Sequence, residues 1–185
     1  MLPFHEGTEG RLDPPRDREA ERLNEEVADL ADYRSEFFGT LRQVLGDREG
    51  IQIVGDRFVF SSEVLFESAS ATLSPEGQAQ IAQVAGILSD VSDQIPNTID
   101  WIIRVDGHTD NIPINTGKYP SNWELSTARA VNVLRYFIES HGISAARLAA
   151  AGFGEYQPVV PNDRPENCAK NRRVELIFHK VSEPQ

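Results

Sequence analysis

Apolar side chains recur at alternating steps of four and three residues between Asp17 and Leu45, a stretch that contains no proline. This heptad spacing predicts a long helix with one apolar seam, which Arg34 interrupts. Such a seam suits two uses, packing against the helix's own domain or pairing with the same helix of a second chain, and the pattern favours neither. The seam residues are Leu23, Val27, Leu30, Phe37, Leu41 and Val44.

The first residues mix glycines and prolines with charges and lack apolar periodicity, which predicts a flexible lead-in over residues 1–16. We therefore expect three parts: this lead-in, a linker or dimerisation helix over residues 17–48, and a main domain over residues 50–182. A length of this order suits one domain with a single hydrophobic core.

The main domain begins with a predicted β-hairpin, because two apolar runs within residues 51–60 flank the turn-forming pair Gly55-Asp56. Ser74-Pro75 then predicts a helix start, with serine as the N-cap and proline in the first helical position. Residues 101–105 predict a strand, which leads into a polar loop over residues 106–111. The buried stripe of the helix is expected at Ile81, Val84, Ala85, Leu88 and Val91.

Ser121 and Glu124 have the spacing of a capping box and predict a helix over residues 122–141. Two further strands are predicted at residues 149–153 and 173–179, with a loop between them. The order of elements indicates an α+β fold, a mixed β/α/β/α/β sheet with helices on one face, preceded by the long N-terminal helix. The core stripe of the second helix is expected at Ala130, Val131, Leu134, Phe137 and Ile138.

The chain of 185 residues has a formal charge of −11 and a pI near 4.8, which argues against a nucleic-acid partner. Cys168 is the single cysteine, so no internal disulfide can form, and without a nearby base it is interpreted as an inert thiol.

No run approaches the roughly 20 apolar residues of a membrane span, and the first residues lack the pattern of a secretory signal. The chain is therefore either cytoplasmic or preceded by a membrane segment that lies outside this sequence.

Asp110 and Arg129 are the candidate ligand-binding pair. A helical projection groups Arg129 with Asn122 and Leu125, roughly opposite the expected core stripe, and Asp110 lies in the loop before this helix. A guanidinium binds a carboxylate through two parallel hydrogen bonds, and an aspartate binds an ammonium, so together they suit a zwitterion such as an amino-acid head group. The alternative is that the two side chains simply pair with each other.

Metal binding and glycan cleavage are two other kinds of chemistry that the acidic residues could suggest. Asp106, His108 and Asp110 alternate as metal ligands can, but no second cluster supplies the remaining ligands. Asp106 and Glu124 could form a carboxylate pair for glycan cleavage, although arbitrary acidic pairs occur in any acidic chain. No nucleophile or phosphate-loop motif is present, so we expect neither an enzyme nor a cofactor or metal site.

At these residues the sequence resembles the OmpA-like peptidoglycan-binding domain, in the version found in flagellar stator proteins of the MotB type. The resemblance spans residues from about 60 to 180 in several motifs with the expected order. The matching stretches are Val105-Asp-Gly-His-Thr-Asp-Asn111, Tyr119-Pro-Ser-Asn-Trp-Glu-Leu-Ser126 with Ala128-Arg129-Ala130, Gly152-Phe-Gly154 and Lys170-Asn-Arg-Arg-Val174.

The resemblance implies non-covalent binding of the diaminopimelate portion of the peptidoglycan stem peptide. By that resemblance Asp110 binds the ammonium and Arg129 the carboxylate. The other site residues implied are Thr109, Asn122, Leu125, Asn171 and Arg172, with backbone contacts from residues 66–69. Cys168 departs from the family, because many relatives carry a basic residue at that position.

The resemblance also implies a setting for the chain. Proteins of this type have an N-terminal transmembrane helix, so the chain is expected in the periplasm, anchored to the inner membrane through a helix absent from this sequence. Expected partners are peptidoglycan, a second copy of the chain and a membrane-embedded stator subunit. An alternative is the wall anchor of a related non-flagellar, stator-like complex in transport or phage defence. Two other hypotheses are a wall-remodelling hydrolase and a purely structural dimerisation module.

Overall fold

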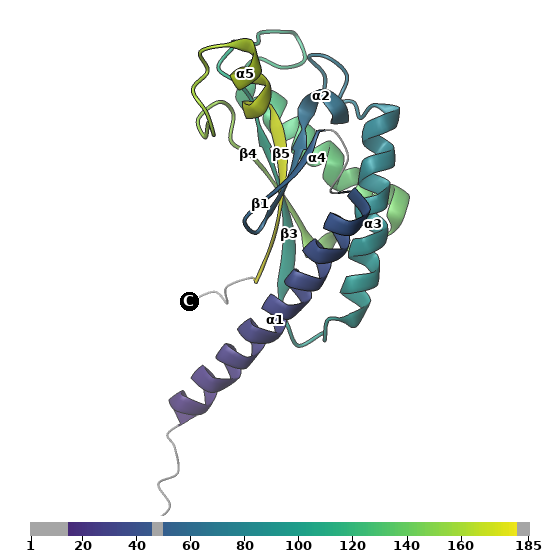
Figure 1. Cartoon of the computed structure of the whole chain (residues 1–185), viewed down its shortest axis with the longest axis vertical. Coiled ribbons are helices and arrows are strands. Elements are labelled where there is room, and N and C mark those ends of the chain that lie inside the picture. The colour runs from purple at the N-terminus through teal and green to yellow at the C-terminus, as the bar shows by residue number, and fades with distance from the viewer. Residues whose placement is uncertain (1–14, 46–49, 181–185) are drawn as a thin grey trace, which may run out of the picture.

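The computed structural model describes residues 15–45 and 50–180, and its centre is a five-stranded mixed sheet in the order β1-β2-β5-β3-β4 (Figure 1). Only β3 and β4 pair in parallel; the other neighbours are antiparallel. The predicted α+β fold with a mixed sheet is confirmed. The strands are β1 (Ile51–Val54), β2 (Arg57–Ser61), β3 (Trp101–His108), β4 (Leu148–Gly152) and β5 (Arg173–Lys180).

The long helices cover one face of the sheet, as predicted (Figure 1). Alternate residues of β3 and β5 point into this layer because successive side chains of a strand face opposite ways. Trp101 and Phe178 stack there with ring centroids 5.0 Å apart, and Ile103 and Leu176 are fully buried. The helices are α1 (Pro15–Leu45), α2 (Ser62–Leu65), α3 (Pro75–Gln94), α4 (Asn122–His141) and α5 (Pro165–Asn171), with a 3-10 turn at Ala145–Arg147.

The second half of α1 packs on its own domain, against α3 and β5. Leu30, Phe37 and Leu41 are buried, and the ring of Phe37 lies 5.8 Å from that of Phe178. Val44, at the end of the same seam, is 45% exposed. The first half of the helix extends beyond the sheet (Figure 1). The seam therefore serves its own domain in part, and dimerisation through α1 stays a prediction.

Several expectations fall outside the described residues, namely most of the lead-in at 1–14, the boundary at 46–49 and the last residues, 181–185. None of the helices that the structure describes is long and apolar enough to cross a membrane.

The helix start at Ser74-Pro75 is confirmed, because the Ser74 side chain accepts a hydrogen bond from the backbone N–H of Gly77. The predicted apolar stripe of α3 is buried throughout.

Two details of the predicted elements were wrong. The polar residues 106–108 continue strand β3 instead of forming a loop, because they pair with the charged start of β5, where Asp106 faces Glu175 and His108 faces Arg173. The predicted loop between the last two strands contains α5, whose seven residues are too few to show helical periodicity.

Helix α4 is rotated relative to the prediction, so that Arg129 lies on its buried face and not on the opposite side. The cause is a close approach of α4 to the sheet at two glycines. A Cβ atom on Gly107 would lie 2.2 Å from the Ser126 carbonyl oxygen, and one on Gly152 would lie 2.6 Å from the Thr127 nitrogen. The buried residues of α4 are Asn122, Leu125, Ser126, Arg129, Ala130, Val133 and Phe137, while Val131, Leu134 and Ile138 are only half-buried.

Candidate functional site

A pocket of about 540 Å³ opens at the end of the sheet where β3 leads into α4 and where α2 lies. Segments far apart in the sequence build it, because the carboxyl end of β3, the first turns of α4 and the residue before β5 meet there. The pocket is lined by Ser62, Glu63, Phe66, Glu67, Ser68, Ala69, Thr109, Asp110, Ile112, Pro113, Ile114, Asn122, Leu125, Arg129 and Arg172.

Asp110 is held firmly in the pocket wall. One carboxylate oxygen accepts a hydrogen bond from the Ile112 backbone N–H at 3.0 Å, and the other accepts one from Arg172 Nη1 at 2.5 Å. Thr109 and Asn122 fix the backbone around it, since the Thr109 hydroxyl and the Asn122 amide both donate to the Asp110 carbonyl oxygen, at 2.8 and 3.3 Å. The carboxylate is thus presented in one orientation.

Arg129 is 6% exposed, and its Nε donates to the Ser70 carbonyl oxygen at 2.9 Å. Its guanidinium lies over the Phe66 ring, 5.0 Å from the centroid. Burial and the nearby Arg172 lower the pKa of Arg129, Tyr119 and Asp110 oppose the shift, and the net pKa is about 10. No carboxylate of residues 15–45 or 50–180 forms an ion pair with it. Because a buried cation without a counter-ion is costly, the site favours an anionic ligand.

The segment that follows α2 forms one wall of the pocket and is held from both sides. Ala69 has a left-handed backbone, with φ of 52°, which is unfavourable for a residue with a Cβ. The next residue, Ser70, receives the hydrogen bond from Arg129, and Ala71 is bound by Asn132 and Tyr119. These contacts maintain the strained turn, and residues 66–69 line the pocket.

Arg172 is the second cation of the pocket. Burial lowers its pKa, but hydrogen bonds to Asp110 and Glu63 outweigh that effect and leave the pKa raised. Asp110 therefore pairs with Arg172, and the two members of the predicted pair, Asp110 and Arg129, do not pair with each other. Glu63 lies on α2, and nothing in the sequence indicated its place here.

Six of the seven predicted site residues line the pocket, and the exception is Asn171. Its side chain is fully buried and bonds the backbone of Val159 and Val160 and the side chain of Asn162. Asn171 thus holds the loop before α5 in place and is the residue next to Arg172 in the chain. Residues not anticipated from the sequence are Ser62, Glu63, Ile112, Pro113 and Ile114.

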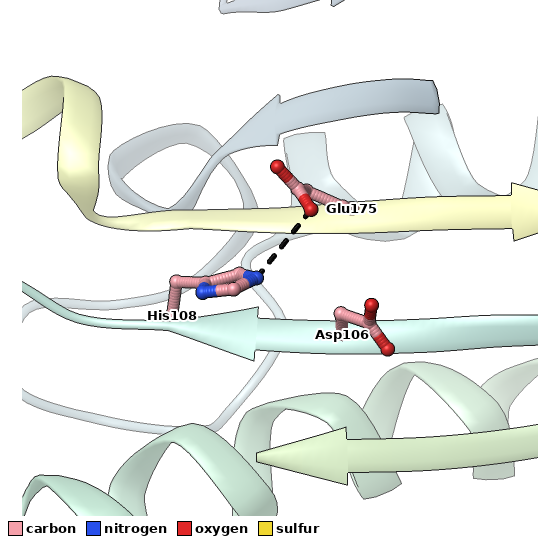
Figure 2. Close-up of side chains that lie close together, drawn as sticks. All are labelled: Asp106, His108 and Glu175. Atoms are coloured by element: carbon pink, nitrogen blue, oxygen red, sulfur yellow. Dashed lines mark ion pairs between the residues drawn. The ribbon is translucent and has the colours of Figure 1, made fainter. Parts of the chain in front are cut away.

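The structure does not bring Asp110 together with Asp106 and His108. These two residues lie on the sheet face opposite the helices, beside Glu175, and their ligand atoms all lie within 4.8 Å of one another (Figure 2). Arg104 binds Asp106 through two hydrogen bonds, at 2.7 and 2.8 Å. His108 stacks on Phe153, which supports its interpretation as a structural residue at the strand end.

Glu175 is paired as fully as Asp106. Arg173 and Arg57 donate to it at 3.0 and 3.1 Å, and His108 Nε2 lies 3.4 Å away (Figure 2). Burial raises the pKa of Glu175, but contacts with His108 and Arg173 outweigh it and lower the pKa to about 2. With three guanidiniums neutralising two carboxylates, the cluster is an ion-pair network and offers no favourable place for a metal cation.

The mixed sheet, the helix layer and a pocket at the β3–α4 junction define an OmpA-type domain, and the chain belongs to the OmpA family, which it matches over residues 65–172. Motility protein B of Bacillus subtilis is 38% identical over 115 residues, which is 62% of this chain and 41% of that protein. The chain thus spans less than half the length of the first curated relatives that it matches.

Solved structures agree with this family. A MotB-like protein from Desulfovibrio vulgaris superposes with a TM-score of 0.71 at 30% identity, covering 86% of this chain and 96% of that one. The periplasmic domain of Helicobacter pylori MotB gives 0.60 at 28% identity, covering 71% and 82%. The cell wall anchor of the T6SS from Pseudomonas aeruginosa gives 0.61 at 32% identity, covering 80% and 96%. The chain is therefore similar both to MotB domains and to a wall anchor of another system.

Proposed function

We propose that this domain binds peptidoglycan without cleaving it, by recognising the zwitterionic end of a diaminopimelate residue in the stem peptide. Arg129 takes the carboxylate of that group, and Asp110 takes the ammonium. The observation that carries the proposal is the buried guanidinium of Arg129, which has no carboxylate partner among the described residues and faces the same pocket as a fixed carboxylate. A ligand with both charges satisfies both residues at once.

Binding of this kind serves as an anchor. The similarity to motility protein B and to a wall anchor supports a role in holding a membrane complex to the wall. We propose an inner-membrane complex of the ion-driven stator type, with this domain in the periplasm, acting as a dimer beside a membrane-embedded subunit. The similarity to the T6SS anchor supports a second candidate, the same wall contact in a transport complex.

The proposed role is non-enzymatic. The described pocket is lined by no histidine, its buried carboxylate Asp110 is engaged by Arg172, and Glu63 and Glu67 are exposed. Cleavage of a glycan or a peptide needs a paired acid and base or an activated nucleophile. Asp106 and Glu124, the carboxylates considered for glycan cleavage, both lie outside the pocket lining.

The test is sedimentation of the protein with purified sacculi. Asp110→Asn and Arg129→Gln each remove one charge-assisted contact, so binding should weaken about ten- to a hundredfold. Asp90→Asn and Arg42→Gln make the same chemical changes at exposed positions and should bind as the unmodified protein does. Unchanged binding of both pocket variants, or release of soluble wall fragments that depends on Asp110, would contradict the proposal.

A further inference from the structure

A second hollow, of about 550 Å³, lies along the outer face of α4. Trp123 borders it and is 49% exposed, which is unusual for the largest apolar side chain. Thr127, Asn132 and Arg135 follow at helical spacing, and Lys118 faces them from the preceding loop. The hollow thus combines an aromatic surface with hydrogen-bonding groups, two cations and the carboxylate of Glu124, and we call it the α4 groove.

The indole of Trp123 is held in place although it is half exposed. Tyr156, itself 59% exposed, stacks on it with ring centroids 5.0 Å apart and an interplanar angle of 25°. Gly154 lies beneath both rings, since a Cβ atom there would be 3.4 Å from the indole and 3.5 Å from the tyrosine ring. A fixed, solvent-facing aromatic ring loses little conformational entropy when a ligand packs on it.

The α4 groove and the Asp110–Arg129 pocket share a wall. The Ser70 carbonyl is bound by Arg129 on the pocket side, while the next residue, Ala71, is bound by Asn132 and Tyr119, which line the groove. One polymer can therefore reach both hollows if its two parts are joined by a short link.

We propose that the α4 groove binds the saccharide backbone of the polymer whose peptide occupies the pocket. The apolar C–H face of a pyranose ring matches the exposed indole, and its hydroxyl and acetamido groups match Thr127, Asn132 and Arg135. A stem peptide joins directly to the sugar, and each residue spans at most about 3.5 Å, so the two parts of one ligand stay close. This inference rests on the proposed function, because it takes the pocket's ligand to be a wall peptide.

Calorimetry with two probes separates the two sites. One probe is the free stem peptide, and the other is the same peptide attached to its disaccharide. The unmodified protein should bind the second about tenfold more tightly, because linked contacts add. Trp123→Ala should lose this advantage and keep its affinity for the free peptide, and Arg135→Glu, an exposed change in the same groove, should reduce the advantage.

Asp110→Asn is the complementary variant, because it should lower the affinity for both probes and preserve the ratio of the two affinities. Equal affinity of the unmodified protein for the two probes would overturn the groove assignment while leaving the peptide pocket intact. Tighter binding of the disaccharide probe that Trp123→Ala and Arg135→Glu both preserve would also overturn it. Binding of peptide-free glycan strands that depends on Trp123, together with no binding of the free peptide, would support the groove and contradict the pocket.

Discussion

Asp110 and Arg172 form a direct ion pair, with Arg172 Nη1 2.5 Å from Asp110 Oδ2, although Arg129 lines the same pocket. The pocket lining therefore holds two cations and three carboxylates, of which Asp110 is buried and Glu63 and Glu67 are exposed. A ligand that brings only an ammonium leaves the buried Arg129 without a counter-ion, whereas a zwitterion supplies that negative charge.

Replacing Arg172 should relax this selectivity. In Arg172→Gln, a peptide that carries an amine without the neighbouring carboxylate should bind about two- to fivefold more tightly than to the unmodified protein, because a partly exposed repulsion is worth up to about 1 kcal/mol. Calorimetric titration with a lysine-containing stem peptide measures this. Weaker binding of that peptide would instead make Arg172 a direct ligand contact.

The network around Glu175 should make the fold sensitive to acid. The folded-state pKa of about 2 lies below the ordinary value of 4.5, so its stabilisation is complete above about pH 4.5 and is lost as the pH falls towards 2. The side chain is 4% exposed, and the shift corresponds to about 3 kcal/mol of unfolding free energy. Urea unfolding at pH 7 and pH 3 should show the loss.

Glu175→Gln should lower stability at pH 7, because Arg173 remains buried without its carboxylate, and should flatten the pH dependence between 4.5 and 2. Glu139→Gln, an exposed change on α4, serves as the matched control and should leave both quantities unchanged. An equally steep acid loss in Glu175→Gln would assign the effect to other carboxylates.

The packing of α4 on the sheet can be tested at a glycine. In Gly107→Ala the new methyl group would overlap the Ser126 carbonyl oxygen, so the helix must shift and stability should fall by about 1–3 kcal/mol. The first turns of α4 carry Asn122 and Arg129, so sacculus binding should fall as well. Gly86→Ala, in the exposed middle of α3 with open space around it, should instead stabilise the protein by about 0.5–1 kcal/mol.

Two seam positions of α1 should respond very differently. Phe37→Ala removes a fully buried ring from the contact with Phe178 and should cost about 3–5 kcal/mol in chemical unfolding. Val44→Ala changes an exposed residue of the same seam and should cost less than about 0.5 kcal/mol. Similar losses at both positions would show that the seam is buried along its whole length, as in a two-chain contact.

The sequence was most informative where structure depends on neighbours along the chain. Ser74-Pro75 marks the start of α3, and Gly55-Asp56 marks the turn between β1 and β2, because capping and turn geometry involve only adjacent residues. The resemblance to known motifs predicted that Asp110 and Arg129 share one site, and both line the pocket. Propensity and periodicity alone indicated only that Asp110 lies close before the helix that carries Arg129.

Contacts between distant segments could not be obtained in this way. Arg172 is 62 residues from Asp110 and 109 from Glu63, so their pairing depends on the completed sheet. The burial of Arg129 depends on how closely α4 approaches Gly107, which helical periodicity does not encode. The extension of β3 depends likewise on charges that β5 supplies across the sheet.

Two stem peptides that differ only in one carboxylate test whether Arg129 binds a carboxylate next to an ammonium. Calorimetric titration compares the diaminopimelate peptide with the lysine peptide, which lacks the carboxylate, in the unmodified protein, Arg129→Gln and Arg42→Gln. The unmodified protein and Arg42→Gln should favour diaminopimelate about ten- to a hundredfold, and Arg129→Gln should bind both peptides alike. Equal affinities in the unmodified protein, or a preference that survives in Arg129→Gln, would contradict the role of Arg129 as the carboxylate-binding residue.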